Sequence, residues 1–77
     1  MKATVHYFAA LREKKGLDME EVDVRPGETV KELYYRLFPG KERDLPVAYA
    51  RNAAHTSSDT PVQSGDEVAF LPPLGGG

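Results

Sequence analysis

The sequence predicts an α+β fold in which one main helix packs across a mixed sheet of four or five strands. Three observations lead to this prediction. Segments in which apolar and polar residues alternate lie near both ends of the chain, which is the pattern of half-buried strands. A capped amphipathic segment lies between them, and 77 residues leave room for a single domain with a small core.

The first quarter of the chain predicts two strands joined by a short helix. The first strand is expected over residues 2–8, with its odd-numbered residues on one face. Residues 9–15 are rich in helix formers and are followed by Gly16, which indicates one or two helical turns with a glycine C-cap. A second strand is expected over residues 19–24, with its two valines facing inward and pairing antiparallel to the first strand.

The main helix is expected over residues 29–38. Thr29 is a favoured N-cap residue, and Glu32 follows three positions later, as in a capping box. Four apolar residues then recur at helical spacing and form one stripe for a sheet to cover, namely Val30, Leu33, Tyr34 and Leu37.

The second half of the chain predicts the remaining strands. A third strand is expected over residues 45–52, at most one short strand over residues 53–60, and a last strand over residues 67–71 after a turn at Gly65. The resulting order of elements, in fewer than 80 residues, fits a β-grasp, which is the ubiquitin-like fold. In that fold the last strand lies centrally, beside and parallel to the first.

The composition excludes several classes of function. The net charge is −2, whereas a nucleic-acid-binding protein would favour a basic face. There is no cysteine, so no disulfide and no thiol nucleophile is available. No apolar run is long enough to span a membrane, and the N-terminus lacks the core of a signal peptide. We therefore expect a cytoplasmic protein that binds neither nucleic acid nor membrane.

The residue pattern does not predict a metal site or an enzyme active site. His6 and His55 are the two histidines, and their spacing is not that of metal ligands. The acidic residues of segment 18–23 are better explained as solvated strand-edge positions. There is no phosphate-binding loop and no dinucleotide fingerprint, so the chain is not expected to catalyse a reaction alone.

The C-terminal segment has the most unusual composition. Residues 72–77 read Pro-Pro-Leu-Gly-Gly-Gly, and the prolines should stop sheet pairing because they have no N–H to donate. Glycines cannot fill a core, but a segment without Cβ atoms can enter a channel too narrow for side chains. From Leu74 to Gly77 the chain can reach roughly 13 Å, at about 3.3 Å per residue. We expect a β-grasp domain over residues 1–71 and a flexible tail over residues 72–77 that delivers its carboxylate to a partner.

Both ends of the chain resemble the small subunit of molybdopterin synthase, which belongs to the ubiquitin-like sulfur carriers. Residues 66–77, Asp-Glu-Val-Ala-Phe-Leu-Pro-Pro-Leu-Gly-Gly-Gly, are similar to that family's C-terminus of acidic strand start, apolar run, Pro-Pro, apolar residue, variable residue and Gly-Gly. Here Gly75 takes the variable position, and Gly76 and Gly77 form the terminal pair. Residues 7–13, Tyr-Phe-Ala-Ala-Leu-Arg-Glu, resemble the family's Phe-Ala-x-x-Arg-Glu segment after the first strand.

The resemblance implies a sulfur carrier for molybdenum cofactor biosynthesis. A ubiquitin-activating-like adenylyltransferase would use ATP to adenylate Gly77, and a sulfur donor would convert the adenylate into a thiocarboxylate. The large subunit of molybdopterin synthase would then pass this sulfur to a pterin precursor. Gly76 and Gly75 would give the tail access to both partners, and the chain itself would bind no cofactor and no metal.

A docking patch for these partners is expected on the sheet. Phe8 and Leu71 should lie side by side on the face away from the helix, where a shared apolar patch marks an interaction site. The resemblance adds Leu74 and Arg12 to the partner contacts. His55 departs from the family pattern, because an apolar residue of the same patch is expected at that position.

Three other interpretations stay open. The chain can be a sulfur carrier for another pathway, such as thiamine or cysteine synthesis, although Pro-Pro and the segment after the first strand favour the molybdopterin type. It can be a ubiquitin-like modifier joined to lysines through Gly77, or an interaction domain with an inert tail. The intact mass of the chain from cells distinguishes a thiocarboxylate, a lysine adduct and an unmodified end.

Overall fold

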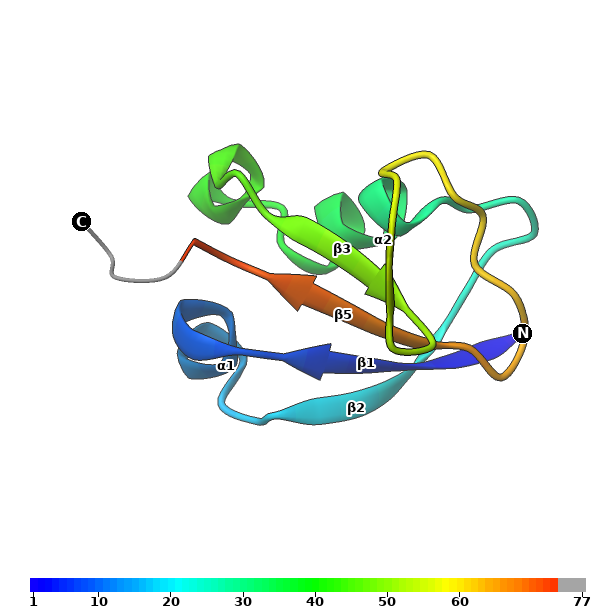
Figure 1. Cartoon of the computed structure of the whole chain (residues 1–77). Coiled ribbons are helices and arrows are strands. Elements are labelled where there is room, and N and C mark those ends of the chain that lie inside the picture. The colour runs from blue at the N-terminus through cyan, green and yellow to red at the C-terminus, as the bar shows by residue number, and fades with distance from the viewer. Residues whose placement is uncertain (74–77) are drawn as a thin grey trace.

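The computed structural model describes residues 1–73, and within them five strands form one mixed sheet in the order β2-β1-β5-β3-β4 (Figure 1). β1 and β5 run parallel, and the other neighbouring strands run antiparallel. The last strand therefore lies centrally beside the first, which confirms the predicted β-grasp. The strand bounds are β1 Lys2–Tyr7, β2 Met19–Asp23, β3 Ala48–Arg51, β4 Ala54–Thr56 and β5 Glu67–Leu71.

The helices begin and end where their capping residues lie. α2 spans Val30–Leu37 and has the predicted capping box, in which Glu32 N–H donates to Thr29 Oγ1 at 3.1 Å and Thr29 N–H donates to Glu32 Oε1 at 2.9 Å. α1 spans Ala9–Lys15 and ends at Gly16, whose φ of 78° is the left-handed conformation that glycine adopts without strain. A short 3₁₀ helix, η1, spans Lys41–Asp44. No helix within residues 1–73 is long and apolar enough to cross a membrane.

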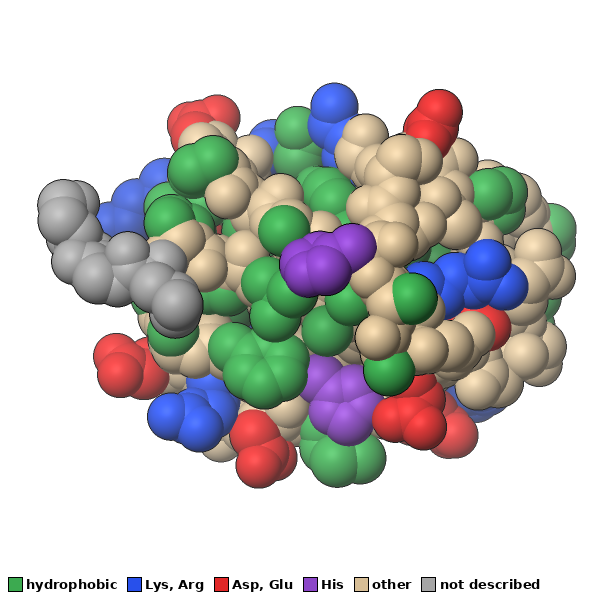
Figure 2. All heavy atoms as spheres, viewed as in Figure 1, with side chains coloured by type: hydrophobic (Ala, Val, Ile, Leu, Met, Phe, Trp, Pro, Cys, Tyr) green, Lys and Arg blue, Asp and Glu red, His purple; other side chains and the backbone are tan. Residues whose placement is uncertain are grey.

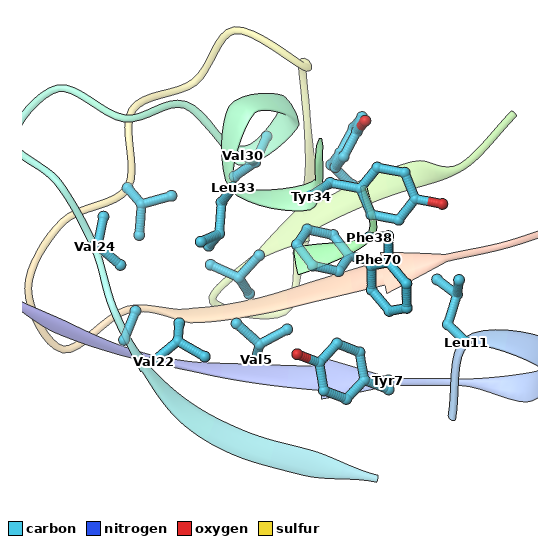
Figure 3. Close-up of a cluster of buried hydrophobic side chains, with 14 residues drawn as sticks. Val5, Tyr7, Leu11, Val22, Val24, Val30, Leu33, Tyr34, Phe38 and Phe70 are labelled. Carbon is cyan, nitrogen blue, oxygen red and sulfur yellow. The ribbon is translucent and has the colours of Figure 1, made fainter. Parts of the chain in front are cut away.

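The core lies between α2 and one face of the sheet, and its centre is aromatic (Figure 3). The ring of Phe70 on β5 lies 5.0 Å from that of Tyr34 on α2, at an interplanar angle of 69°. Such edge-to-face contacts contribute about 0.5–1.5 kcal/mol beyond the burial of the rings. Phe38 belongs to this cluster although the predicted stripe did not include it, whereas Leu37 is only half-buried. The reason is that α2 ends at Leu37, so Phe38 leaves the helical path and turns its ring toward Tyr7, 5.6 Å away.

The third strand is shorter than predicted. It was expected over residues 45–52 but begins at Ala48. Val47 N–H donates to the carbonyl of Leu45 at 2.9 Å, so these residues form a tight turn after η1, and Pro46 between them has no N–H for a ladder. The predicted first and second strands each extend one residue beyond the observed ends, at Tyr7 and Asp23.

Candidate functional site

The C-terminal tail continues from the central strand of the sheet. Val68 and Phe70 of β5 point into the core and are fully buried, and this burial holds the strand in register. Ala69 and Leu71 alternate with them and therefore lie on the opposite face, where Leu71 is opposite Ala48 of β3. The chain thus leaves the domain from the middle of the sheet, and its exit is set by two core residues.

Two prolines follow β5 at the point where the chain leaves the sheet. Pro72 is buried and Pro73 is exposed, so the first residue of the expected tail packs against the body of the domain. In Figure 1 β5 ends on the side of the molecule where α1 and η1 also lie. Residues 74–77 lie outside the described residues. The predictions for Leu74, Gly75, Gly76 and Gly77 therefore stay predictions.

Phe8 lies at the level of Leu71 on the face away from α2. The parallel register places Tyr7 opposite Phe70, and Phe8 and Leu71 are the residues that follow them in the sequence. Phe8 is the N-cap residue of α1 and is still extended, with φ −132° and ψ 151°, and it is 44% exposed. Ala9 after it has a φ of 50°, a conformation that costs a non-glycine residue about 1–2 kcal/mol. This strained residue turns the chain sharply and leaves the Phe8 ring outside the core.

Arg12 lies one helical turn beyond Phe8. Its N–H donates to the Phe8 carbonyl at 3.3 Å, and its own carbonyl accepts from Gly16 N–H at 2.8 Å. Its side chain is exposed on α1. Arg12 is therefore accessible to a partner on the same side of the molecule as Phe8.

The open face of the sheet also contains two alanines, Ala50 and Ala69, that sequence reasoning did not identify as part of a site. Figure 2 shows hydrophobic side chains gathered between two histidines on this face. The strand register places Ala69 of β5 opposite both His6 of β1 and Ala50 of β3, and Ala50 opposite His55 of β4. The alternation of Ala48 and Ala50 with the buried Tyr49 was the signal that could have placed these alanines on the open face. We call the four residues His6, Ala69, Ala50 and His55 the histidine–alanine row.

The buried charges of the domain serve its structure. The carboxylate of Asp66, at the start of β5, accepts hydrogen bonds from Arg51 Nε at 2.7 Å, Asn52 Nδ2 at 3.0 Å and Gln63 N–H at 2.7 Å. Burial alone raises the pKa of Asp66, but the hydrogen bonds from Asn52, Gln63 and Arg51 outweigh it and hold the pKa below its usual range. This cluster ties β5 to the β3–β4 hairpin.

A second buried carboxylate fastens the start of α2. Glu28 accepts from Arg36 Nε and Nη2, each at 2.9 Å, and from Arg25 N–H at 3.0 Å. The hydrogen bond from Arg36 is the main reason why the pKa of Glu28 is lowered.

The hydroxyl of Tyr7 is also engaged inside the domain. It donates to Glu20 Oε2 at 2.6 Å, and burial, followed by this hydrogen bond, raises the pKa of the Tyr7 hydroxyl. Each of these groups is engaged inside the domain, which leaves them unavailable as acids or bases for a ligand.

Metal-binding groups and surface hollows are the other kinds of candidate site among residues 1–73. Within residues 1–73, no three His, Asp or Glu side chains are grouped to hold a metal ion. A hollow of about 660 Å³ on the α2 side is lined in part by Arg25, Tyr35 and Arg43, and it contains none of the predicted site residues. Within the described residues, the predicted site residues Phe8 and Leu71 lie at the end of the sheet from which the chain continues into its C-terminal segment.

Comparisons with known proteins agree with this picture. A family profile, that of the ThiS family, matches residues 5–77. No curated protein sequence matches the chain significantly. Among solved structures, SAMP1 from Haloferax volcanii is 26% identical with a TM-score of 0.80, and the alignment covers 100% of both chains.

Two further structures carry the name of a molybdopterin-converting factor. Putative molybdopterin converting factor subunit 1 from Pyrococcus furiosus is 28% identical with a TM-score of 0.81, over 96% of this chain and 99% of that one. A chain in the complex of subunits 1 and 2 of molybdopterin-converting factor from Helicobacter pylori is 25% identical with a TM-score of 0.65, over 100% of both chains. These similarities confirm the fold class predicted from the sequence.

Proposed function

The chain belongs to the ThiS family of small β-grasp sulfur carriers, and on this premise we propose that it is the sulfur-donating small subunit of a molybdopterin synthase. The observation that carries the proposal is the C-terminus, where a central strand continues through Pro-Pro into a terminal Gly-Gly. The similarity to the putative molybdopterin converting factor subunit 1 from Pyrococcus furiosus supports this pathway.

The proposed chemistry takes place at the carboxylate of Gly77. A carboxylate is a poor electrophile, so one of its oxygens first attacks the α-phosphorus of ATP, which forms an acyl adenylate and releases pyrophosphate. A sulfur donor then attacks the acyl carbon, AMP leaves, and a thiocarboxylate remains. This activation requires an adenylyltransferase and ATP, which suits the cytoplasmic location expected from the sequence.

The second partner is a large synthase subunit. The complex of subunits 1 and 2 from Helicobacter pylori supports a partner of this kind. The thiocarboxylate is soft and nucleophilic, so within such a complex its sulfur can attack a carbon of a pterin precursor and displace an oxygen substituent. Water then hydrolyses the acyl–sulfur bond, which leaves the sulfur on the precursor and restores the carboxylate of Gly77. Gly75 and Gly76 give the thin approach to the large subunit's active site, and Phe8 and Leu71 dock against its surface beside the exit. The catalytic groups belong to the partners, and this chain contributes the reactive end.

A protein-modifying role is the alternative with a specific observation in its favour. SAMP1, whose full name is small archaeal modifier protein 1, matches the whole chain with a TM-score of 0.80. A modifier needs the same adenylation, but the activated Gly77 is then attacked by a lysine amine instead of a sulfur donor. The two roles therefore differ in the product and share the tail.

Intact mass spectrometry tests the proposal directly. The full chain is incubated with ATP, a sulfide source and the adenylyltransferase homologue of its own genome, and the product is then added to the large-subunit homologue and precursor. In the first step we expect the mass of the chain to increase by the difference between one sulfur atom and one oxygen atom. In the second step we expect this sulfur to be transferred to the precursor. Deletion of Gly77 should abolish both steps, because reacting atoms must come within about 3–3.5 Å of each other. The control is Gly75→Ala, which should retain most activity because that position is variable in the resembling family.

Lysine adducts in place of the sulfur shift would support the modifier role. An unchanged mass in the full chain, or a Gly77 deletion as active as the full chain, would show that the terminal carboxylate does not carry sulfur.

A further inference from the structure

The hollow on the α2 side combines basic side chains with an aromatic ring. It has a volume of about 660 Å³, and one arginine lines it from each of three elements: the segment between β2 and α2, α2 itself, and η1. These arginines are Arg25, Arg36 and Arg43. Tyr35, Glu28 and Glu32 also line the hollow. Its charged side chains are therefore more often basic than acidic, in a chain whose net charge is −2.

One glutamate and one arginine of the hollow neutralise each other. Glu28 is buried, and its carboxylate accepts from Arg36 Nε and Nη2, each at 2.9 Å. Arg36 Nη2 also donates to the carbonyl of Asp23 at 2.7 Å. A two-point pair of this kind is among the stronger interactions of a guanidinium group. Glu28 and Arg36 are therefore committed to the structure of the domain, and the other charges decide what the hollow attracts.

Three other cations keep their charge available. Within residues 1–73, Arg25, Lys31 and Arg43 form no ion pair. Arg43 and Lys31 lie over the ring of Tyr35, with Arg43 Cζ at 4.8 Å and Lys31 Nζ at 5.5 Å from its centroid. Arg43 Nη2 also donates to the Tyr35 carbonyl at 3.2 Å. An aromatic ring attracts and orients a cation without neutralising it, so both groups can still pair with an anion.

One carboxylate of the hollow opposes the binding of an anion. Glu32 is exposed, although its Oε1 accepts from Thr29 N–H at 2.9 Å in the capping box. Asp44 follows Arg43 in the sequence but does not line the hollow. The three cations around Tyr35 outnumber Glu32, and the surface here is positive.

The shape of the hollow favours a protein segment as its ligand. Arg25, Glu32 and Arg43 are exposed, so the hollow is open to solvent, whereas sites for small molecules enclose most of their ligand. A nucleic acid would favour a larger basic face than a chain of net charge −2 presents. We propose that the hollow docks an acidic segment of another protein, whose carboxylates pair with Arg25, Lys31 and Arg43 around Tyr35.

This site lies on the opposite side of the sheet from the docking patch. Phe8 and Leu71 are on the face away from α2, whereas Tyr35 belongs to α2 itself. A protein that binds the hollow and a protein that binds the docking patch approach from different sides, so the chain can hold both at once. The inference goes beyond the proposed function, because it requires neither Gly77 nor the large subunit.

The expected strength follows from the exposure of the cations. An exposed ion pair changes affinity by a factor of about 1.5 to 5. Arg25→Gln and Arg43→Gln should each weaken binding by such a factor, and the double variant by about 2- to 25-fold. Raising the salt concentration from about 0.05 M to 0.5 M should also weaken binding, because screening shortens the reach of exposed charges.

NMR titration of the full chain with a short synthetic peptide of alternating aspartate and glutamate tests this inference. We expect shift changes concentrated at residues 25–36 and at Arg43, and none with the matched peptide of asparagine and glutamine. Arg25→Gln/Arg43→Gln should bind the acidic peptide more weakly. The matched control is Lys2→Gln/Lys14→Gln, which removes the same charge from side chains that do not line the hollow and should bind like the wild type.

The ring of Tyr35 has its own test. Tyr35→Phe keeps the ring and should bind like the wild type, whereas Tyr35→Leu should bind more weakly because Lys31 and Arg43 lose the group that orients them. Tyr35 is half-buried, so melting curves of both variants accompany the titration. If Tyr35→Leu does not fold, the exposed arginine variants decide the result.

Four outcomes would contradict the inference. Equal weakening in the two double variants would mean that the peptide responds to net charge alone. Shift changes confined to the open face of the sheet would place the peptide elsewhere. Inorganic pyrophosphate that bound the hollow more tightly than the peptide would make it a phosphate site. Displacement of the bound peptide by the large-subunit homologue would show that the two faces cannot be occupied together.

Discussion

Replacing Asp66 by asparagine should strongly destabilise the domain at neutral pH, although the two side chains have the same shape. The Asp66 side chain is 8% exposed and stands at the start of β5, where it joins this strand to the β3–β4 hairpin. Because the C-terminal segment follows β5 directly, the same cluster also holds the strand that leads into this segment. The substitution changes one oxygen into an NH₂ group and removes one charge.

The structure allows the loss to be estimated. Two donors, Arg51 Nε and Gln63 N–H, share Oδ2 of Asp66, so the remaining oxygen of the variant should stay with them. The new NH₂ then faces Asn52 Nδ2, which is also a donor. Asn52 cannot flip without cost, because its Oδ1 accepts from Glu67 N–H at 2.9 Å. The loss of one charge-assisted hydrogen bond and of the attraction to Arg51 should lower the free energy of unfolding by about 2–4 kcal/mol. For a domain of this size that lowers Tm by about 10–25 °C.

The pH dependence has a definite sign. The pKa of Asp66 is lowered in the folded chain, so between the unfolded and folded pKa values the unfolded chain binds more protons. The stabilisation is present above the unfolded pKa of about 3.9 and is lost as the pH falls through the lower folded value. The difference in stability between the wild type and Asp66→Asn should therefore narrow below about pH 4.

Urea unfolding followed by circular dichroism, repeated from about pH 7 down to about pH 2.5, measures this difference. Asp23→Asn is the matched control, because Asp23 also forms an ion pair but its side chain is 78% exposed. That control should cost less than about 0.5 kcal/mol. Our reasoning is wrong if the free energy of unfolding of Asp66→Asn is within about 0.5 kcal/mol of the wild-type value at pH 7. It is also wrong if the difference between the two free energies is the same at every pH.

The remaining predictions concern the hairpin turn, the docking patch and the core. Ala53 has a φ of 68°, so Ala53→Gly should raise the free energy of unfolding by about 0.5–1.5 kcal/mol in urea titrations, and an unchanged midpoint would contradict this. Phe8→Asp should weaken binding of the large subunit at least about tenfold with little change in Tm, because Phe8 is exposed and aspartate is a favoured N-cap residue. Leu71→Asp should act in the same direction on binding, and normal affinity in both variants would remove the patch from the interface. Phe70→Ala, one residue away, should instead cost about 3–5 kcal/mol and unfold much of the protein, whereas a small loss of stability would argue against the aromatic core.

The sequence by itself determined the features that depend on neighbouring residues. The capping box of Thr29 and Glu32, the glycine C-cap at Gly16 and the alternation along β1 and β5 are local patterns, and the structure has each of them. The central place of β5 could also be predicted, because the order of the elements restricts a chain of this length to few topologies. The Gly-Gly end and its resemblance to sulfur carriers were visible without coordinates.

Only the tertiary structure decided which distant residues meet. Asp66 joins Arg51 and Asn52 across 15 and 14 positions of sequence, and His6 meets Glu67 across 61. These contacts depend on the register between strands, and a shift by one residue would move every side chain to the other face. Register is set by how the aromatic rings around Phe70 fill the core, which no local pattern encodes. The histidine–alanine row exists for the same reason, because packing on the covered face determines which residues line up on the open one.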